Sequence, residues 1–229
     1  MNVKELVEEY TDNSSFELVA QNNNSFTIEG EYKLFAEYND IILADDYALR
    51  IVISNNYPSE IPIVYELSGK IPSKYPHISA DRALCLGIRG DIACELEREP
   101  SLASFVETTV QSALYSAKFF FKYGKYPFGE RKHGAKGILS YYEDLFEADQ
   151  ATSLKLLRTI ALDQYRGHSY CPCGSSQRLR DCHGKTLLSI MRSPVRHAAA
   201  KRDYEDIVKE LKVLKSAQRK PALFQPSME

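Results

Sequence analysis

Residues 26–53 read FTIEGEYKLFAEYNDIILADDYALRIVI and decide the fold of this chain. In the first half of the stretch, apolar and charged side chains alternate. This period of two is typical of a half-buried β-strand. The run NNYPSEIP, with its two prolines, ends the pattern at its C-terminal side. The stretch therefore predicts two antiparallel strands, each with one buried face, formed by Phe26, Ile28, Tyr32, Leu34 and Ala36 in the first and by Tyr47, Leu49, Ile51 and Ile53 in the second.

Further elements are predicted on both sides of this pair. Residues 3–10 fit a short amphipathic helix, and residues 16–20 and 63–67 fit short strands. The result is a helix followed by a four-stranded antiparallel meander, the first half of an α+β domain. Glycine and proline predict an irregular stretch over residues 71–98. Apolar residues at helical spacing then predict helices over residues 101–122, 138–146, 153–165 and 194–217.

The composition is that of an ordinary globular protein, with 44% hydrophobic and 26% charged residues in a chain of 229. No apolar run approaches the ~20 residues that a membrane-spanning helix needs. The acidic, helical N-terminus resembles neither a signal peptide nor a transit peptide, so a cytoplasmic location is predicted. Five cysteines in such a compartment argue against disulfides and indicate metal binding or catalysis.

Charge is distributed unevenly along the chain. Residues 1–150 contain 24 Asp and Glu against 14 Lys and Arg, whereas residues 151–229 contain 7 against 15, giving net charges of −10 and +8. The second part either meets an acidic partner or is a solvated basic helix. We expect three regions: a main domain over residues 1–150, a helix with a small cysteine-rich module over 151–190, and a basic helix with a frayed tail over 191–229.

Three short motifs surround Cys85. They are YPSEIP at residues 57–62, KYPHI at 74–78 and ALCLG at 83–87. Their order, with a seven-residue step from the isoleucine of the second motif to Cys85, resembles the ubiquitin-conjugating enzymes, in particular the divergent prokaryotic branch of that family. The resemblance covers roughly residues 1–145. It implies a ubiquitin-conjugating-enzyme-like α+β fold, with the helix, the meander and the later helices in the family's order.

The resemblance also implies that Cys85 carries a ubiquitin-like modifier, or another protein's C-terminus, as a thioester. A thiolate is a good nucleophile when the acyl group arrives and a good leaving group when an amine removes it. A free cysteine has a pKa of about 8.5, so a small fraction is thiolate at neutral pH. Taken alone, such a cysteine is ordinarily a small buried hydrophobe. The surrounding motifs favour the nucleophile.

Two histidines are further candidate catalytic residues. His77 stands where the family carries an asparagine that is thought to stabilise the oxyanion or the loop. It is expected to donate a hydrogen bond there, to act as a base for the incoming amine, or only to hold the loop. His133 lies between glycines in PFGERKHG, with loop folding as the alternative interpretation. Cys94 has no motif around it and is predicted to be core or surface filler.

A second cysteine cluster lies near the C-terminus, where CPCG at residues 171–174 is followed by CHG at 182–184. It resembles the SEC-C motif, the short zinc-binding motif at the C-terminus of bacterial SecA. The resemblance implies one zinc ion bound by Cys171, Cys173, Cys182 and His183. Three thiolates and an imidazole complete a tetrahedral shell with no open position, so a structural ion is expected. A segment this short has no core of its own, and metal binding should supply much of its folding energy.

The leading hypothesis is therefore a bacterial ubiquitin-conjugating-type transferase with a zinc module. The resemblance implies an activating enzyme and a ubiquitin-like modifier as partners, a JAB-type isopeptidase in the same system, and a setting in anti-phage defence; no membrane partner is expected. The alternative is a non-catalytic scaffold or adaptor, with an unreactive Cys85 and a zinc module that binds protein or nucleic acid. Nucleic acid is the weaker partner, because the basic tail lacks interleaved aromatic residues.

Overall fold

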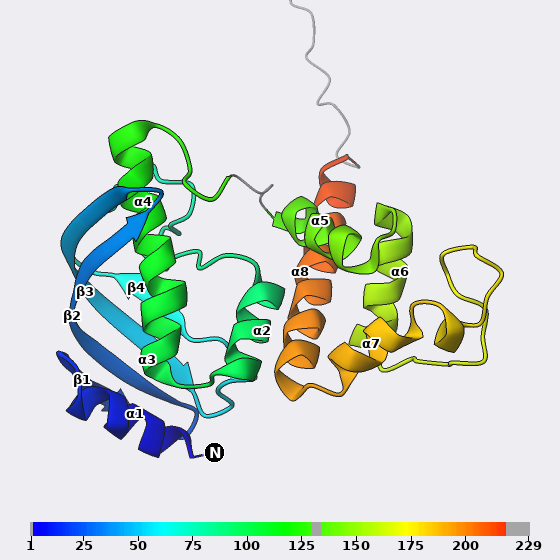
Figure 1. The fold of residues 1–229 in the computed structure, drawn as a ribbon, viewed down its shortest axis with the longest axis horizontal. Coiled ribbons are helices and arrows are strands. Elements are labelled where there is room, and N and C mark those ends of the chain that lie inside the picture. The colour runs from blue at the N-terminus through cyan, green and yellow to red at the C-terminus, as the bar shows by residue number, and fades with distance from the viewer. Residues whose placement is uncertain (1, 130–133, 219–229) are drawn as a thin grey trace, which may run out of the picture. The chain divides into compact units, whose positions relative to one another are not determined.

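A computed structural model describes residues 2–129 and 134–218. The chain divides into two compact units (Figure 1). The first comprises Met1–Arg131 and Ser189–Ala199, and the second comprises Lys132–Leu188 and Ala200–Glu229. Among the helices of the described residues, none combines the length and the apolar character that crossing a bilayer requires.

The first unit is an α+β domain built on one antiparallel sheet with strand order β1-β2-β3-β4. The predicted meander is confirmed. Its two long central strands are paired without interruption from Ser25 opposite Ser54 to Tyr38 opposite Ile41. The strands are β1 (Phe16–Gln21), β2 (Ser25–Tyr38), β3 (Ile41–Ser54) and β4 (Ile63–Glu66).

A two-residue turn at Asn39 and Asp40 joins β2 to β3. Both residues have positive φ, 48° and 61°, and a tight hairpin turn whose twist matches its strands requires this left-handed conformation at both positions. Asn and Asp adopt it more readily than other residues that carry a side chain. The turn sets the register of the hairpin, and the register decides which face of each strand is buried.

One face of the sheet is covered by a long helical segment (Figure 1). The segment runs through α3 (Leu102–Phe105), the π-helical turn η1 (Val106–Val110) and α4 (Gln111–Tyr123). Ser101 caps its N-terminus, as predicted, by accepting a hydrogen bond of 3.1 Å from the backbone N–H of Ser104. The sheet residues buried beneath it are Phe26, Ile28, Leu34, Leu43, Tyr47, Leu49, Ile51, Ile53 and Val64.

Two shorter helices complete the first unit. The predicted N-terminal helix is α1 (Val3–Asp12), which packs against β1 and α3. The second, α2 (Arg89–Arg98), lies in the stretch predicted to be irregular, so that prediction was wrong. The glycines at 87 and 90 favoured an irregular chain in the sequence. The helix nevertheless has a short apolar face at helical spacing, which it buries: Ile92, Ala93 and Leu96. Cys94 is half-buried on this helix.

The second unit contains α5 (Gly134–Phe146), α6 (Gln150–Ala161), most of α7 (Gly184–Met191) and the main part of α8 (Pro194–Gln218). Of these helices only α7 was not predicted. The first two pack against each other. The hydroxyl of Tyr142 on α5 donates a hydrogen bond of 3.0 Å to the buried carboxylate of Asp203 on α8. This bond satisfies a buried charged group and links α5 to α8.

Asp45 joins the sheet to α4 and predicts a pH dependence of stability. Its carboxylate lies 2.5 Å from the ammonium of Lys118 and 2.8 Å from that of Lys70. Burial alone would raise the pKa of Asp45, but the hydrogen bonds from the two lysines outweigh it and lower that pKa to about 2. Because the folded pKa lies below the ordinary value, the contribution is complete above about pH 4 and is lost as the pH falls through 2.

We expect Asp45→Asn to lower the free energy of unfolding at pH 7 by about 1–2 kcal/mol. The difference from the unchanged protein should shrink steadily between pH 4 and pH 2. Urea unfolding followed by circular dichroism at several pH values measures it. Asp46→Asn removes an exposed carboxylate from the same strand and should show a much smaller loss. A difference for Asp45→Asn that does not change with pH would contradict the pairing with the two lysines.

Candidate functional site

Cys85 is exposed and directly follows the buried Leu84. The chain here is extended and pairs with the sheet: Leu84 forms a bridge with Ile78, and its N–H donates a hydrogen bond of 2.8 Å to the carbonyl of Val64 on β4. Successive side chains of an extended segment point to opposite sides. The buried Leu84 thus anchors a backbone that presents the next side chain, the Cys85 thiol, to solvent.

The KYPHI motif lies beside this thiol. The N–H of Cys85 donates a hydrogen bond of 2.9 Å to the carbonyl of His77. The half-buried His77 ring lies 5.3 Å from the ring of Tyr75 and 5.2 Å from that of Tyr126, which it meets edge-on. Burial raises the pKa of Tyr75, and the nearby Tyr126 hydroxyl and Cys85 thiol raise it further. The structure therefore brings Cys85 and His77 together beside two tyrosines.

A buried ion pair fixes the loop ahead of the candidate nucleophile. Glu66, at the end of β4, is fully buried and pairs with the guanidinium of Arg82. Arg82 also donates hydrogen bonds from Nε to the carbonyl of Glu66 at 3.1 Å and from Nη1 to that of Ile71 at 2.6 Å. The Glu66 carboxylate accepts further hydrogen bonds from the Ser68 hydroxyl and the Lys70 N–H. Both ends of the loop are thus tied to β4.

Sequence reasoning missed Tyr126 and the Glu66–Arg82 pair. Tyr126 belongs to none of the motifs and comes beside His77 only through the fold. A signal for the pair was present, since Glu66 falls on the same face of its strand as the buried Val64, and an inward-facing glutamate requires a partner. The other candidate, His133, lies outside the described residues.

The four predicted metal ligands form one cluster. The ligand atoms of Cys171, Cys173, Cys182 and His183 all lie within 4.8 Å of one another. Nδ1 of His183 is 3.1 Å from the Cys171 sulfur and 3.2 Å from that of Cys182, and the sulfurs of Cys173 and Cys182 are 3.6 Å apart. Three sulfurs and one nitrogen converging in this way can hold a metal ion.

The orientation of the His183 ring supports the same assignment. Its Nε2 lies 2.9 Å from the carbonyl oxygen of Phe146 at the end of α5. Because a carbonyl can only accept, Nε2 carries the proton and Nδ1 turns its lone pair toward the three sulfurs. Metal-binding histidines in proteins are generally held in this way by their second nitrogen.

A short hairpin carries the first two cysteines of the cluster. Tyr170 and Arg178 form a bridge across it, and the N–H of Cys171 donates a hydrogen bond of 2.8 Å to the carbonyl of Gln177. Gly174, at the turn after the CxC pair, has φ +80°, a conformation that glycine adopts without strain. The local backbone therefore folds the CxC sulfurs back toward the later Cys-His pair.

The thiols of this hairpin differ in their proton affinity. Burial raises the pKa of Cys171 to about 11, whereas a hydrogen bond with the Ser175 hydroxyl lowers that of Cys173 to about 6. A buried thiolate at Cys171 needs a positive charge beside it. A bound metal ion supplies that charge and allows all three sulfurs to be deprotonated.

No protein-family model, curated protein or solved structure matches this chain.

Proposed function

We propose that this chain is a ubiquitin-conjugating-type transferase whose Cys85 carries a ubiquitin-like modifier, or another protein's C-terminus, as a thioester. The observation that supports this most is the exposed thiol of Cys85, held beside His77 by the hydrogen bond between their backbones. The four-stranded antiparallel meander that precedes them, and the order of the three motifs, support a ubiquitin-conjugating-enzyme-like fold.

The proposed chemistry has two steps. First, the Cys85 thiolate attacks the thioester carbonyl on a partner activating enzyme; a new C–S bond forms at Cys85, and the old one breaks to release that enzyme's thiolate. Second, a target amine attacks the same carbonyl, loses a proton and forms an amide, and Cys85 leaves as the thiolate. Each step passes through an oxyanion. In this proposal the ring of His77 donates a hydrogen bond to that oxyanion or accepts the proton of the amine.

We also propose that the metal of the Cys3His cluster is a structural zinc ion and that the module around it recognises a protein. Four protein ligands leave no open coordination position for catalysis. Tyr170 supports a recognition surface, because its side chain is 66% exposed and the Arg178 guanidinium lies 4.5 Å from its ring. Three further features stay predictions: that a JAB-type isopeptidase acts in the same system, that the system serves anti-phage defence, and that the protein is cytoplasmic.

A reconstituted charging reaction tests the role of Cys85. Incubated with ATP, its activating enzyme and the modifier, the chain should form an adduct that a reducing agent removes. Cys85→Ala should abolish the adduct, because the proposed thioester forms on the Cys85 sulfur. Cys94→Ala, at the half-buried cysteine of α2, should leave its yield unchanged. An adduct that persists in Cys85→Ala would rule out Cys85 as the carrier.

Alkylation separates the transferase from the non-catalytic adaptor without any partner. Brief treatment with N-ethylmaleimide, followed by peptide mapping, compares the rates at Cys85 and Cys94 in the native protein. The transferase requires fast labelling of Cys85. Equal, slow labelling of both cysteines would favour the adaptor.

A further inference from the structure

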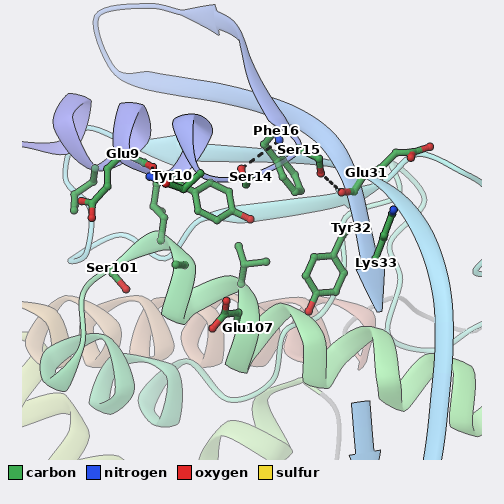
Figure 2. A pocket seen from close by; sticks show the side chains of 15 residues that line it. Glu9, Tyr10, Ser14, Ser15, Phe16, Glu31, Tyr32, Lys33, Ser101 and Glu107 are labelled. Carbon is green, nitrogen blue, oxygen red and sulfur yellow. Dashed lines mark hydrogen bonds between the residues drawn. The ribbon is translucent and has the colours of Figure 1, made fainter. Parts of the chain in front are cut away.

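One hollow of the first unit lies away from the motifs that surround Cys85. It has a volume of about 680 Å³ and is enclosed by α1, the β1–β2 strands, the start of α3 and η1 (Figure 2). Ligand pockets in proteins commonly fall between about 300 and 1,000 Å³. None of the functional residues inferred from the sequence lines it, so it is a separate candidate site.

The floor of this cavity is apolar. Leu6 on α1, Leu102 at the start of α3 and Val106 at the start of η1 line it together with two aromatic rings. The rings belong to Tyr10 and Phe16, whose centroids are 5.5 Å apart. An aliphatic or aromatic ligand body would therefore be removed from water there.

Three polar side chains belong to the lining of the cavity. Figure 2 shows the side chains of Tyr10, Tyr32 and Glu107 lining one hollow from α1, β2 and η1. Burial raises the pKa of Tyr10, and the nearby Tyr32 and Glu107 raise it further. The Tyr32 hydroxyl donates a hydrogen bond of 2.9 Å to Oε1 of Gln111, which leaves its own oxygen able to accept another. Burial and, to a smaller extent, the nearby Glu107 raise the pKa of Tyr32 to about 12. Both phenols thus stay neutral near physiological pH, with a carboxylate beside them.

The charge of the lining selects the kind of ligand. Glu9, Glu31 and Glu107 contribute three carboxylates, against one lysine, Lys33. Within the described residues, none of these carboxylates forms an ion pair. The hollow therefore has a net negative lining, and the exposed carboxylate of Glu107 has no cationic partner among the described residues. Such a lining attracts a cation and repels an anion.

The local backbone gives a second reason to regard Glu107 as functional. It belongs to a five-residue π-helical turn, Val106–Val110, inserted between the α-helical segments α3 and α4. π-Turns inside α-helices are rare and occur frequently at functional sites. The turn interrupts the regular helix at the point where the Glu107 side chain enters the cavity.

We propose that this cavity binds a small aliphatic amine, with the ammonium group held by Glu107 and the oxygens of Tyr10 and Tyr32 and the methylene chain against Leu6 and Val106. The ammonium donates three hydrogen bonds, which matches the three oxygens. This binding function is separate from the proposed transfer chemistry at Cys85 and does not depend on it.

Calorimetric titration of the full chain with cadaverine and spermidine tests the proposal. We expect saturable one-site binding that weakens as salt is added. Pentanol and valerate, which keep the aliphatic chain but are neutral or anionic, should bind at least about tenfold more weakly, because a charged hydrogen bond contributes a factor of that order. Equal binding of valerate and cadaverine, or no saturable binding of either amine, would overturn the proposal.

Two variants assign the binding to this cavity. Glu107→Gln keeps the shape of an exposed side chain, so the fold should be unaffected, and should weaken cadaverine binding by about tenfold or more. Tyr10→Phe keeps the ring against Phe16 and should weaken binding by a smaller factor. Glu37→Gln makes the same charge change on β2, outside the lining, and should leave the affinity within about twofold. Unchanged affinity in Glu107→Gln would place the amine elsewhere and refute the site.

Discussion

Removal of the proposed metal ion from the cluster of Cys171, Cys173, Cys182 and His183 is expected to unfold residues 165–183 while the sheet of the first unit stays intact. Within these residues the only helical turn is η2 (Leu179–Asp181), and the buried apolar side chains are those of Cys171 and Leu179. Structural zinc sites bind with about 10–16 kcal/mol, as much as the whole stability of a typical domain. The segment has nothing comparable to replace this contribution.

Metal content and hydrogen exchange measure this effect together. The purified chain should contain about one zinc ion, as a closed four-ligand site requires. After treatment with a chelator, peptides covering residues 165–183 should exchange rapidly, whereas peptides from β2 and β3 keep their protection. Cys171→Ser should reproduce the effect without a chelator. Cys94→Ser, at the half-buried cysteine of α2, should keep both the metal and the protection. Full metal content in Cys171→Ser would show that the ion is held elsewhere.

Arg82→Met is expected to lower the free energy of unfolding of the first unit by about 3–5 kcal/mol. The change leaves the fully buried Glu66 carboxylate without its cation and removes the two hydrogen bonds from Arg82 to the carbonyls of Glu66 and Ile71. Because this loop leads directly into Cys85, thioester formation should fall as well.

A double-mutant cycle separates the ion pair from the loss of side-chain packing. In Glu66→Gln with Arg82→Met, the loss should be clearly smaller than the sum of the two single losses, because no buried charge is left uncompensated. Arg50→Met is the matched control: its pair with Glu29 at 2.6 Å is exposed, so the loss should stay below about 1 kcal/mol. Urea unfolding gives all four values. Equal losses for Arg82→Met and Arg50→Met would contradict a stabilising role for the buried pair.

The sheet was predictable because its information is local. Alternation along β2 and β3 identified the buried face correctly at Phe26, Ile28 and Leu34, and two residues with left-handed conformations, Asn39 and Asp40, closed the hairpin. Helix α2 was not predictable in the same way, since only four of its ten residues are buried and glycine lies in its first turn. A short element with so weak a pattern depends on the surface against which it packs.

The two clusters differ in how much of them could be predicted. The four candidate metal ligands lie within thirteen residues of one another and come together through a local hairpin, so the resemblance to the SEC-C motif was enough to predict the cluster of Cys171, Cys173, Cys182 and His183. The partners of that cluster did not follow from spacing, because the carbonyl that orients His183 belongs to Phe146, on a different helix. At the other cluster, the motifs identified Cys85 and His77, but not Tyr126, which lies far beyond them in the chain.

By itself, the sequence determined the four-stranded meander and the helices with a clear apolar stripe, because periodicity is a property of neighbouring residues. The candidate thiol and the candidate metal ligands followed from short motifs that resemble those of known families. Only the tertiary structure decided that Tyr142 on α5 bonds Asp203 on α8, that Glu66 and Arg82 pair in the interior, and that Tyr10, Tyr32 and Glu107 line one cavity. Each of these depends on contacts between segments distant in the chain. Local sequence patterns do not predict such contacts, because the contacts form only when the hydrophobic core brings the segments together.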